Sequence, residues 1–245
     1  AGYRALFANT TGTQNVAVGA FALDANTTAN QSTAIGYQAL TASTTGVSNT
    51  AVGNLALAGN TTASNNIGLG NNALASNTTG SENTAVGAVA LDANTTASNN
   101  TAIGFNSLGA NTTGSSNTAL GFQSLATCST GSHNTGLGVF VLNGLTTGQF
   151  NTAAGLNAGI DITTGDNNLM LGLNAGRSTA PSGSITTSDN NVCLGDNSIA
   201  NLFCADTSIS SSDSRDKTDV ESFNIGLKWI EALRPVTYRW DRRTW

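Results

Sequence analysis

The residues with the clearest chemical potential lie together near the C-terminal end, in the segment Ser212-Asp213-Ser214-Arg215-Asp216-Lys217. A serine hydroxyl attacks a carbonyl at neutral pH only when a base accepts its proton, and a desolvated lysine can serve as that base. Ser212 and Lys217 supply both groups. Arg215 is a poor base because a guanidinium stays protonated, so we expect it to hold the loop or an acidic partner. The alternative is a charged linker without chemistry.

The chain ahead of this segment follows a fixed short repeat, marked by glycines at every seventeenth position from Gly2 to Gly172. Such a period over most of a chain indicates a repeat architecture. Paired threonines keep the same spacing from Thr10-Thr11 to Thr163-Thr164, with one substitution at Ser129. The aliphatic residues before the glycines form a second column: Val18, Ile35, Val52, Leu69, Val86, Ile103, Leu120, Leu137 and Leu171. A leucine column comprises Leu6, Leu23, Leu40, Leu57, Leu74, Leu91, Leu108, Leu125 and Leu142. An asparagine column comprises Asn15, Asn49, Asn66, Asn83, Asn100, Asn117, Asn134, Asn151 and Asn168.

A repeat of this length is too short for a helical hairpin, and the richness in Asn, Thr and Gly favours short strands and tight turns. The repeat therefore predicts an all-β fold, a parallel β-solenoid or β-roll. Each coil is expected to hold two strands of about five residues joined by two turns. We expect both aliphatic columns to fill the interior and the asparagines to stack their amides against turn backbone. The glycines are expected where a side chain is not tolerated or φ is positive.

A solenoid this slender has a small interior and is marginal alone, because the buried fraction falls with size. Aromatic residues recur near the glycine and leucine columns and could pack between chains: Phe7, Phe21, Tyr37, Phe105 and Phe122. We therefore expect a homotrimer around a threefold axis. Three side-by-side solenoids and three interwoven chains both satisfy the columns, and a capped monomer is the remaining alternative. The start at Ala1, in mid-repeat, favours a fragment of a longer fibre.

Three domain segments follow from composition. Residues 1–205 form the repeat shaft, with an irregular insertion near 177–190 that lengthens the step of the glycine column between Gly172 and Gly195. Residues 206–212 form a junction. Residues 213–245 begin a second domain, which holds all three tryptophans and has most of the basic residues. Asn224 is expected to cap a helix over 225–233, and residues 236–240 alternate as a strand.

This second domain resembles a known family. The pattern Ser-Asp-x-Arg-x-Lys at 212–217 is followed by Leu233-Arg234-Pro235-Val236-Thr237-Tyr238. Both parts resemble the start of the endosialidase-type intramolecular chaperone, the autocleaving C-terminal domain of phage tail fibres and tailspikes. The resemblance implies the first part of a small α+β chaperone that trimerises and guides the folding of the β-structure ahead of it. The resemblance further implies that this chaperone cuts itself off between Ser212 and Asp213. Ser212 and Lys217 would be the catalytic pair, with Asp213 and Arg215 as neighbours of the cleavage site. An inactive site is the alternative.

Other site chemistry has little support. Glycan hydrolysis needs two carboxylates about 5–10 Å apart, whereas Asp24 and Asp92 share a column four coils apart and Glu82 lies elsewhere in the repeat. We expect no metal and no cofactor. Five further residues are expected to have structural roles in turns and not to bind cations: Asp161, Asp166, Asp189, Asp196 and His133.

Cysteines and charge exclude further classes. Cys128, Cys193 and Cys204 form no regular framework, and two of them replace column residues. The net charge of −5 argues against nucleic acid and anionic membranes as partners. No apolar run approaches the length that a membrane-spanning helix needs. The repeated Asn-Thr-Thr triplets match the glycosylation sequon, although turn chemistry explains them without sugar.

These observations favour a phage tail-fibre shaft that spaces or presents a host-receptor-binding region. Its expected partners are itself, a host surface glycan or outer-membrane component, and other tail proteins, and its expected location is the extracellular virion. The only catalysis expected is one serine–lysine self-cut. The alternative is a bacterial trimeric adhesin or another extracellular filament, because the repeat is similar to the rolls of trimeric autotransporter heads. An ice-binding solenoid is disfavoured, because adjacent threonines on a strand point to opposite faces.

Overall fold

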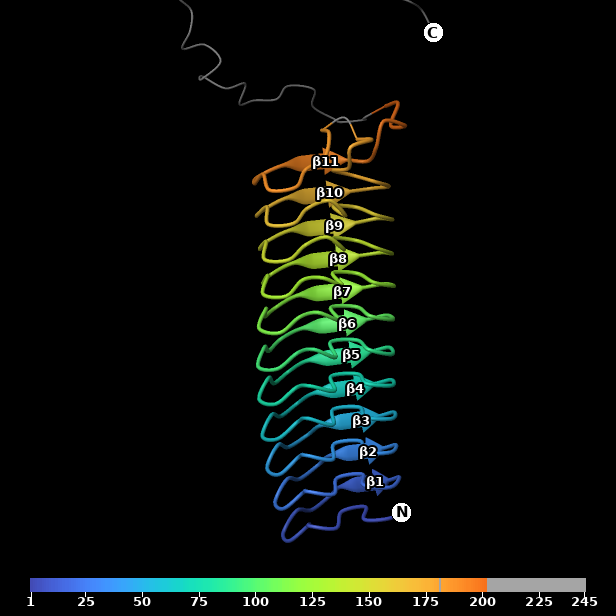
Figure 1. Cartoon of the computed structure of the whole chain (residues 1–245), viewed down its shortest axis with the longest axis vertical. Helices are drawn as coiled ribbons and strands as arrows, with labels where there is room; N and C mark the ends of the chain where they lie inside the picture. The colour runs from blue at the N-terminus through green and yellow to red at the C-terminus, as the bar shows by residue number, and fades with distance from the viewer. Residues whose placement is uncertain (181, 202–245) are drawn as a thin grey trace, which may run out of the picture. The chain divides into compact units, whose positions relative to one another are not determined.

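The repeat folds as a parallel β-solenoid. The computed structural model describes residues 1–180 and 182–201, and Ala1–Ala200 form one compact unit. Its coils stack in a single column with the strands above one another (Figure 1). None of the described residues lies in a helix that is long and apolar enough to cross a membrane. The strands are β1 (Val16–Val18), β2 (Thr33–Ile35), β3 (Thr50–Val52), β4 (Ile67–Leu69), β5 (Thr84–Val86), β6 (Thr101–Ile103), β7 (Thr118–Leu120), β8 (Thr135–Leu137), β9 (Thr152–Ala154), β10 (Leu169–Leu171) and β11 (Val192–Leu194).

The eleven strands form one parallel sheet in sequence order. Each residue pairs with its counterpart one repeat later, as Ala17 does with Ala34. The longer step between β10 and β11 keeps this register, because Met170 still pairs with Cys193. The prediction of a parallel all-β solenoid with one coil per repeat is therefore confirmed.

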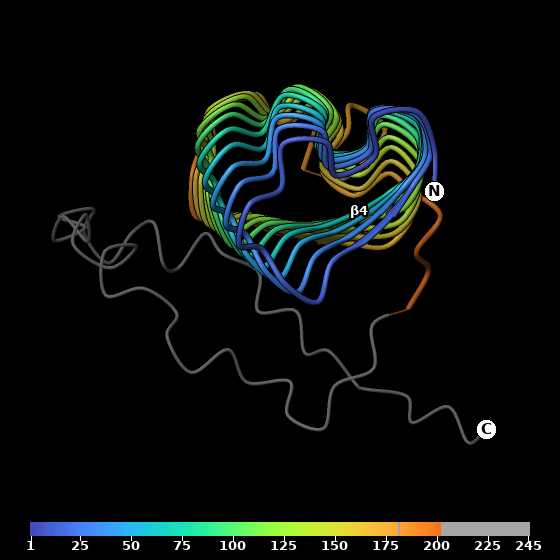
Figure 2. The same ribbon diagram turned by 90° about the horizontal axis from the view of Figure 1, so that it is seen from below.

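Each coil holds one strand of three residues, so the prediction of two longer strands per coil was wrong. Besides the column glycine, three positions per coil interrupt the extended backbone with positive φ, for example Phe21 (61°), Leu23 (51°) and Gln31 (59°). Their N–H groups still bond to neighbouring coils, at 2.8 Å to Tyr3 O for Phe21 and 3.1 Å to Ala39 O for Leu23. Hydrogen bonds between coils thus replace a second strand, and the turns give the cross-section its lobes (Figure 2).

The glycine column sets how closely the coils approach. Gly121 has φ +135°, and a Cβ at this position would collide with the carbonyl oxygen of Gly138 in the next coil. The same collision recurs along the column, so the expectation that these positions need positive φ and tolerate no side chain is confirmed.

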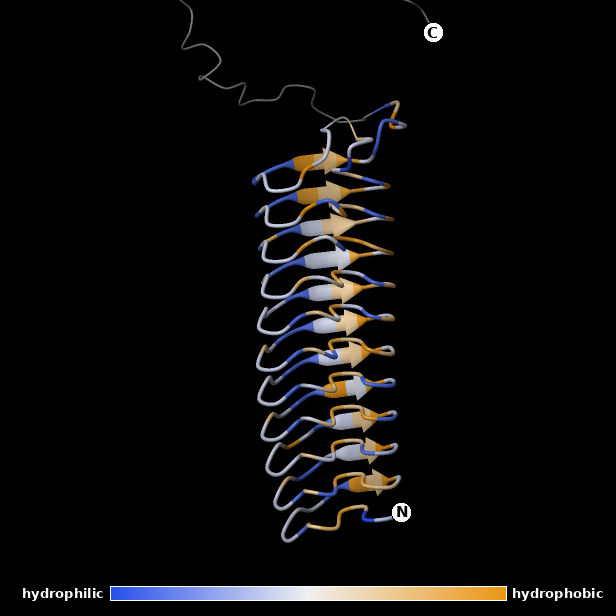
Figure 3. Ribbon diagram, in the orientation of Figure 1, coloured by the Kyte–Doolittle hydropathy of each residue, from blue (hydrophilic) through white to orange (hydrophobic). Residues whose placement is uncertain are grey.

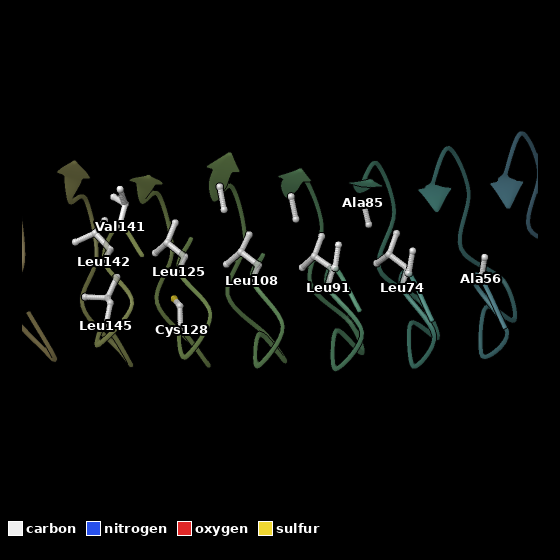
Figure 4. Packing of buried hydrophobic residues seen from close by; sticks show 14 of the residues in the cluster. Ala56, Leu74, Ala85, Leu91, Leu108, Leu125, Cys128, Val141, Leu142 and Leu145 are labelled. Atoms are coloured by element: carbon white, nitrogen blue, oxygen red, sulfur yellow. The ribbon is translucent and has the colours of Figure 1, made fainter. Parts of the chain in front are cut away.

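The core consists of three buried columns: the leucines, the small residues just before them, such as Ala56 and Ala73, and the middle residues of the strands. Leu74, Leu91 and Leu108 are fully buried and stack one per coil (Figure 4). The middle residue of each strand also points inward, and it is an alanine or glycine in most coils. By contrast, the aliphatic column before the glycines lies outside, with Val18 45% exposed and Leu120 47% exposed. The prediction that this column fills the interior was wrong, because successive side chains of a strand alternate between faces.

The asparagine column forms a hydrogen-bonded ladder, as predicted. The backbone N–H of Asn83 donates to Asn66 Oδ1 at 2.9 Å, and the amide of Asn83 donates to Ala97 O at 2.8 Å. The contacts repeat in coil after coil, as for Asn100 and Asn117. Each side chain therefore satisfies backbone groups on two turns, and these buried groups would otherwise be unpaired.

A second asparagine ladder uses the first residue of the Asn-Thr-Thr triplets. Asn77 donates to Asn60 Oδ1 at 3.0 Å, Asn94 to Asn77 Oδ1 at 2.8 Å and Asn111 to Asn94 Oδ1 at 3.0 Å. These four side chains are fully buried. The folded solenoid therefore leaves no room for a sugar on them, and turn chemistry accounts for the triplets.

The second ladder is interrupted at Ser43. Among the described residues, Ser43 Oγ and Asn26 Oδ1 are buried without a hydrogen-bond partner. A buried acceptor without a partner costs about 1–3 kcal/mol. An asparagine at position 43 would occupy the same place as Asn60 and Asn77, and its amide would reach Asn26 Oδ1.

We expect Ser43→Asn to raise the free energy of unfolding by about 1 kcal/mol, because it completes the ladder from Asn26 to Asn60. Chemical denaturation would measure the change. Ser43→Ala is the matched control: it removes the unpaired hydroxyl but leaves Asn26 Oδ1 unpaired, so it should stabilise less than Ser43→Asn. Equal stability of the two variants would contradict the ladder interpretation.

The register predicts an effect of deletion length. Removal of 84–100 joins Asn83 to Thr101 and keeps every column, so we expect a cooperative solenoid that is one coil shorter. Removal of 84–101 leaves one coil a residue short, which moves one strand's inward residue to the outside. We expect the second variant to lose several degrees of thermal stability relative to the first, measured by circular dichroism.

Candidate functional site

The predicted catalytic segment lies outside the described residues. This applies to Ser212, Asp213, Arg215 and Lys217, to the helix expected over 225–233 and to the strand expected over 236–240. Their roles stay predictions. The described candidate for function is the outer surface of the solenoid.

The strands present an uncharged outer face. The first and third residues of each strand point outward, and the third is aliphatic in all eleven strands, from Val18 to Leu194. Many of these side chains are exposed, for example Leu137 at 41% and Ile35 at 39%. The hydrophobic colour in Figure 3 follows this column on the strands. None of the strands from β1 to β11 contains a charged residue.

The residues that directly follow the glycines form a second column, which is apolar except at Asn54, Asn71 and Asp196. Exposed members are Tyr3, Tyr37, Phe105, Phe122, Val139, Leu156 and Leu173. Phe105 stacks on Phe122 with ring centroids 5.5 Å apart, and Phe122 meets Phe140 edge-on at 5.3 Å. The glycine lies between this column and the third strand residues. We call the two columns together the apolar corner.

Sequence reasoning missed the outer strand column, although a signal for it was present. The residue between the two larger strand residues is alanine or glycine in nine of the eleven strands, with Met170 and Cys193 as the exceptions. A position restricted to small residues between larger ones indicates that the small residue faces the crowded interior and the larger ones face outward.

The N-terminal coils carry a small charged and aromatic cluster. Arg4 Nε lies 3.1 Å from Asp24 Oδ1, and the Arg4 guanidinium lies over the rings of Phe7 and Phe21. The pair is partly exposed, so its contribution to stability is small. Asp92 shares the column of Asp24 four coils away, and burial raises the pKa of its carboxyl. The two carboxylates are therefore not placed to act together on a glycan.

Three of the acidic turn residues, Asp166, Asp189 and Asp196, cap backbone groups, as expected, and Asp161 bonds to a side chain. Asp166 Oδ1 accepts from Gln149 N at 2.7 Å, and Asp189 Oδ1 accepts from Asp166 N at 2.7 Å. The Ser198 N–H, 2.9 Å from Asp196 Oδ1, holds the pKa of Asp196 below its usual range. Asp161 Oδ2 accepts from Ser184 Oγ at 2.8 Å. Within 1–180 and 182–201, no group of three or more potential ligands could hold a metal ion.

His133 occupies a turn position with φ 59°, and its ring stacks on Phe150 with centroids 5.1 Å apart. The two residues belong to the same column, one coil apart. This arrangement gives His133 a packing partner on the surface, consistent with the expected turn role.

The two described cysteines replace column residues, as the sequence indicated. Cys128 takes the place of an asparagine in the second ladder, with Sγ 3.6 Å from Gly131 O, and Cys193 takes the place of an inward strand alanine. Both are free and buried. Burial raises the pKa of Cys128 to about 11. Cys204 lies outside the described residues.

Comparison with protein families places a known domain at the C-terminal end. Residues 212–244 match the family described as the chaperone of endosialidase. The match begins at Ser212 and covers both motifs of the resemblance, at 212–217 and 233–238. Searches of curated proteins and of solved structures each found no match to the chain.

The thiols offer a direct test of the buried columns. A thiol reacts as its thiolate, so Cys128, with a pKa of about 11 and no exposed surface, should resist a water-soluble disulfide reagent at pH 8. In a Cys204→Ser background we expect no reaction of the native protein within minutes and two thiols after denaturation, measured by absorbance. Rapid native reaction of Cys128 would contradict the ladder position.

Proposed function

We propose that this chain is the shaft of a phage tail fibre or tailspike, matured by a C-terminal chaperone that cuts itself off. The observation that carries the proposal is the order of parts. A regular β-solenoid runs to the end of the described residues, and the chaperone match begins shortly afterwards at Ser212. A rod of stacked coils joined to a releasable folding domain fits an extracellular, virion-borne fibre.

The domain boundaries of the proposal are the shaft at 1–205, the junction at 206–212 and the beginning of the chaperone from 213. The shaft is proposed to space or present a region that binds a host glycan or outer-membrane component, and to attach to other tail proteins. Its role is mechanical and adhesive. Support comes from hydrogen bonds between coils around the circumference, because they resist bending and slippage of the stack.

The proposed cut is a single hydrolysis. The Ser212–Asp213 amide bond breaks, one water is consumed, and the products are a carboxylate on Ser212 and an amine on Asp213. Lys217, as a neutral, desolvated amine, takes the proton of the Ser212 hydroxyl, and the serine oxygen attacks the carbonyl of the Ser212–Asp213 bond. The Asp213 amine leaves with that proton, and water then hydrolyses the resulting ester. Arg215 holds the segment in place and keeps its proton.

A bacterial trimeric adhesin is the second candidate. The repeated Thr-Ala-Ile-Gly and Thr-Ala-Val-Gly segments favour it, because they are similar to the rolls of trimeric autotransporter heads. The two candidates differ at the junction, since the adhesin hypothesis gives no role to cleavage at Ser212.

We expect the denatured intact mass of the full-length gene product to correspond to a chain that ends at Ser212. Ser212→Ala and Lys217→Met should leave the chain whole, because each removes one member of the catalytic pair. Ser214→Ala is the matched control and should be cut like the wild type. An uncut wild-type chain would overturn the self-cleavage and favour the adhesin.

A further inference from the structure

The apolar corner is a long exposed apolar surface. Eleven strands at about 4.8 Å per step give a length of about 48 Å, and the two columns, which are two residues apart along the chain, lie about 7 Å from each other. The corner thus covers roughly 300 Å² per chain, within the range of the largest apolar patches on monomeric proteins, and such patches are often functional. A surface of this kind is a candidate contact for a partner.

The charge distribution limits what that partner can be. The apolar corner has no charged residue from Tyr3 to Leu173, and its one charged position is Asp196, after Gly195 in the last described coil. Other described acidic groups, such as Asp24, Glu82 and Asp92, lie in other columns. An uncharged patch gives a charged ligand no counter-ion. Identical copies of this chain can meet at such a patch without like-charge repulsion, although the chain carries a net charge of −5.

The two-sided shape of the corner favours a ring of copies. A twofold dimer uses one self-complementary patch, whereas a cyclic ring joins two different patches of each subunit. The corner offers two such patches, the third strand residues on one side of the glycine and the residues after the glycine on the other. Both columns repeat once per coil, so parallel copies in register would meet at every level.

The second column is not uniform along the shaft. Residues after the glycine are Asn54, Asn71 and Ala88 in the middle coils but are large and apolar from Phe105 to Leu173. The coils from Phe105 to Leu173 therefore have the widest apolar surface, and Asp196 ends it in the coil of β11. Contacts between copies are expected to be tightest there.

We propose that the apolar corner is the contact between three parallel copies of this chain, with the third strand residues of one copy packed on the residues after the glycine of the next. In this arrangement Leu120 of one copy packs on Phe122 of its neighbour, and Leu137 packs on Val139 one coil further along. The inference rests on the proposed fibre function and specifies the surface and the pairing through which the copies assemble.

The test compares charge substitutions on two faces of the same coils. Leu120→Lys/Leu137→Lys places two charges in the corner, and Thr113→Lys/Thr130→Lys places two at exposed turn positions elsewhere in the repeat. Light scattering on the full chain gives the assembly mass, intact mass spectrometry gives the cut, and circular dichroism checks the fold. We expect a wild-type trimer, an unchanged trimer for the threonine variant, and a dissociation constant raised at least about 100-fold for the leucine variant.

A charge-pair variant tests the pairing of unlike columns. Leu120→Lys alone should weaken the trimer, and Leu120→Lys/Phe122→Glu should restore much of it, because the lysine of one copy meets the glutamate of the next. Failure of this rescue would overturn the unlike pairing. A monomeric or dimeric wild type, or a leucine variant that stays fully trimeric, would overturn the interface.

The two proposals can fail separately. A trimer that depends on Leu120 and Leu137 but is never cut would support the interface and contradict the self-cleaving chaperone. A chain that is cut at Ser212, and whose trimer is unaffected by the substitutions at Leu120 and Leu137, would support the self-cleaving chaperone and contradict the interface. The assembly mass and the chain mass are read from the same preparation.

Discussion

The close, in-register approach of each coil to the next governs the whole solenoid. The glycine column permits that approach, since a Cβ on Gly121 would meet the Gly138 carbonyl. Every other column then stacks on itself. Amides stack into ladders, leucines fill a continuous core, and threonine hydroxyls bond to carbonyls one coil away, as Thr78 does to Thr95 O at 2.9 Å. Because each residue meets its own counterpart, a single departure such as Ser43 leaves an unpaired atom in the neighbouring coil.

The same stacking places small apolar residues inside the solenoid and many of the larger ones outside. The narrow interior accepts only alanine or glycine at most inward strand positions, so the larger aliphatic side chains lie outside. The solenoid therefore buries little per strand and leaves a long apolar surface in water. Hydrogen bonds between coils hold the single chain together, whereas the outer apolar surface is the one that we propose for contacts between copies. In that proposal, the residues that stabilise the stack of coils and the residues that join the copies are separate sets.

The sequence predicted the features that depend on the period: the parallel solenoid, the buried leucines, the asparagine ladder and the glycine column. It failed where local preference and tertiary context disagree. Leucine rarely takes positive φ, yet Leu23 does so, because its N–H bonds to the next coil and its side chain fills the core. The small residue at the middle of each strand marks the interior: Ala34 is fully buried, whereas the larger Ile35 beside it is exposed. The prediction placed the larger residue inside. The roles of Ser212 and Lys217 stay predictions, because the family match covers their segment without assigning residue roles and their positions lie outside the described residues.

The longer coil before β11 shows how the shaft accommodates variation. The buried column that holds Ile162 resumes at Ile185, and the strand register is intact on either side of the extra residues. The added length is thus taken up entirely by the turn that follows Gly176. A turn of this kind can acquire new sequence while the stacked columns keep theirs. Under the proposed fibre function, new sequence at the side turns would change what the shaft displays and leave the scaffold unchanged.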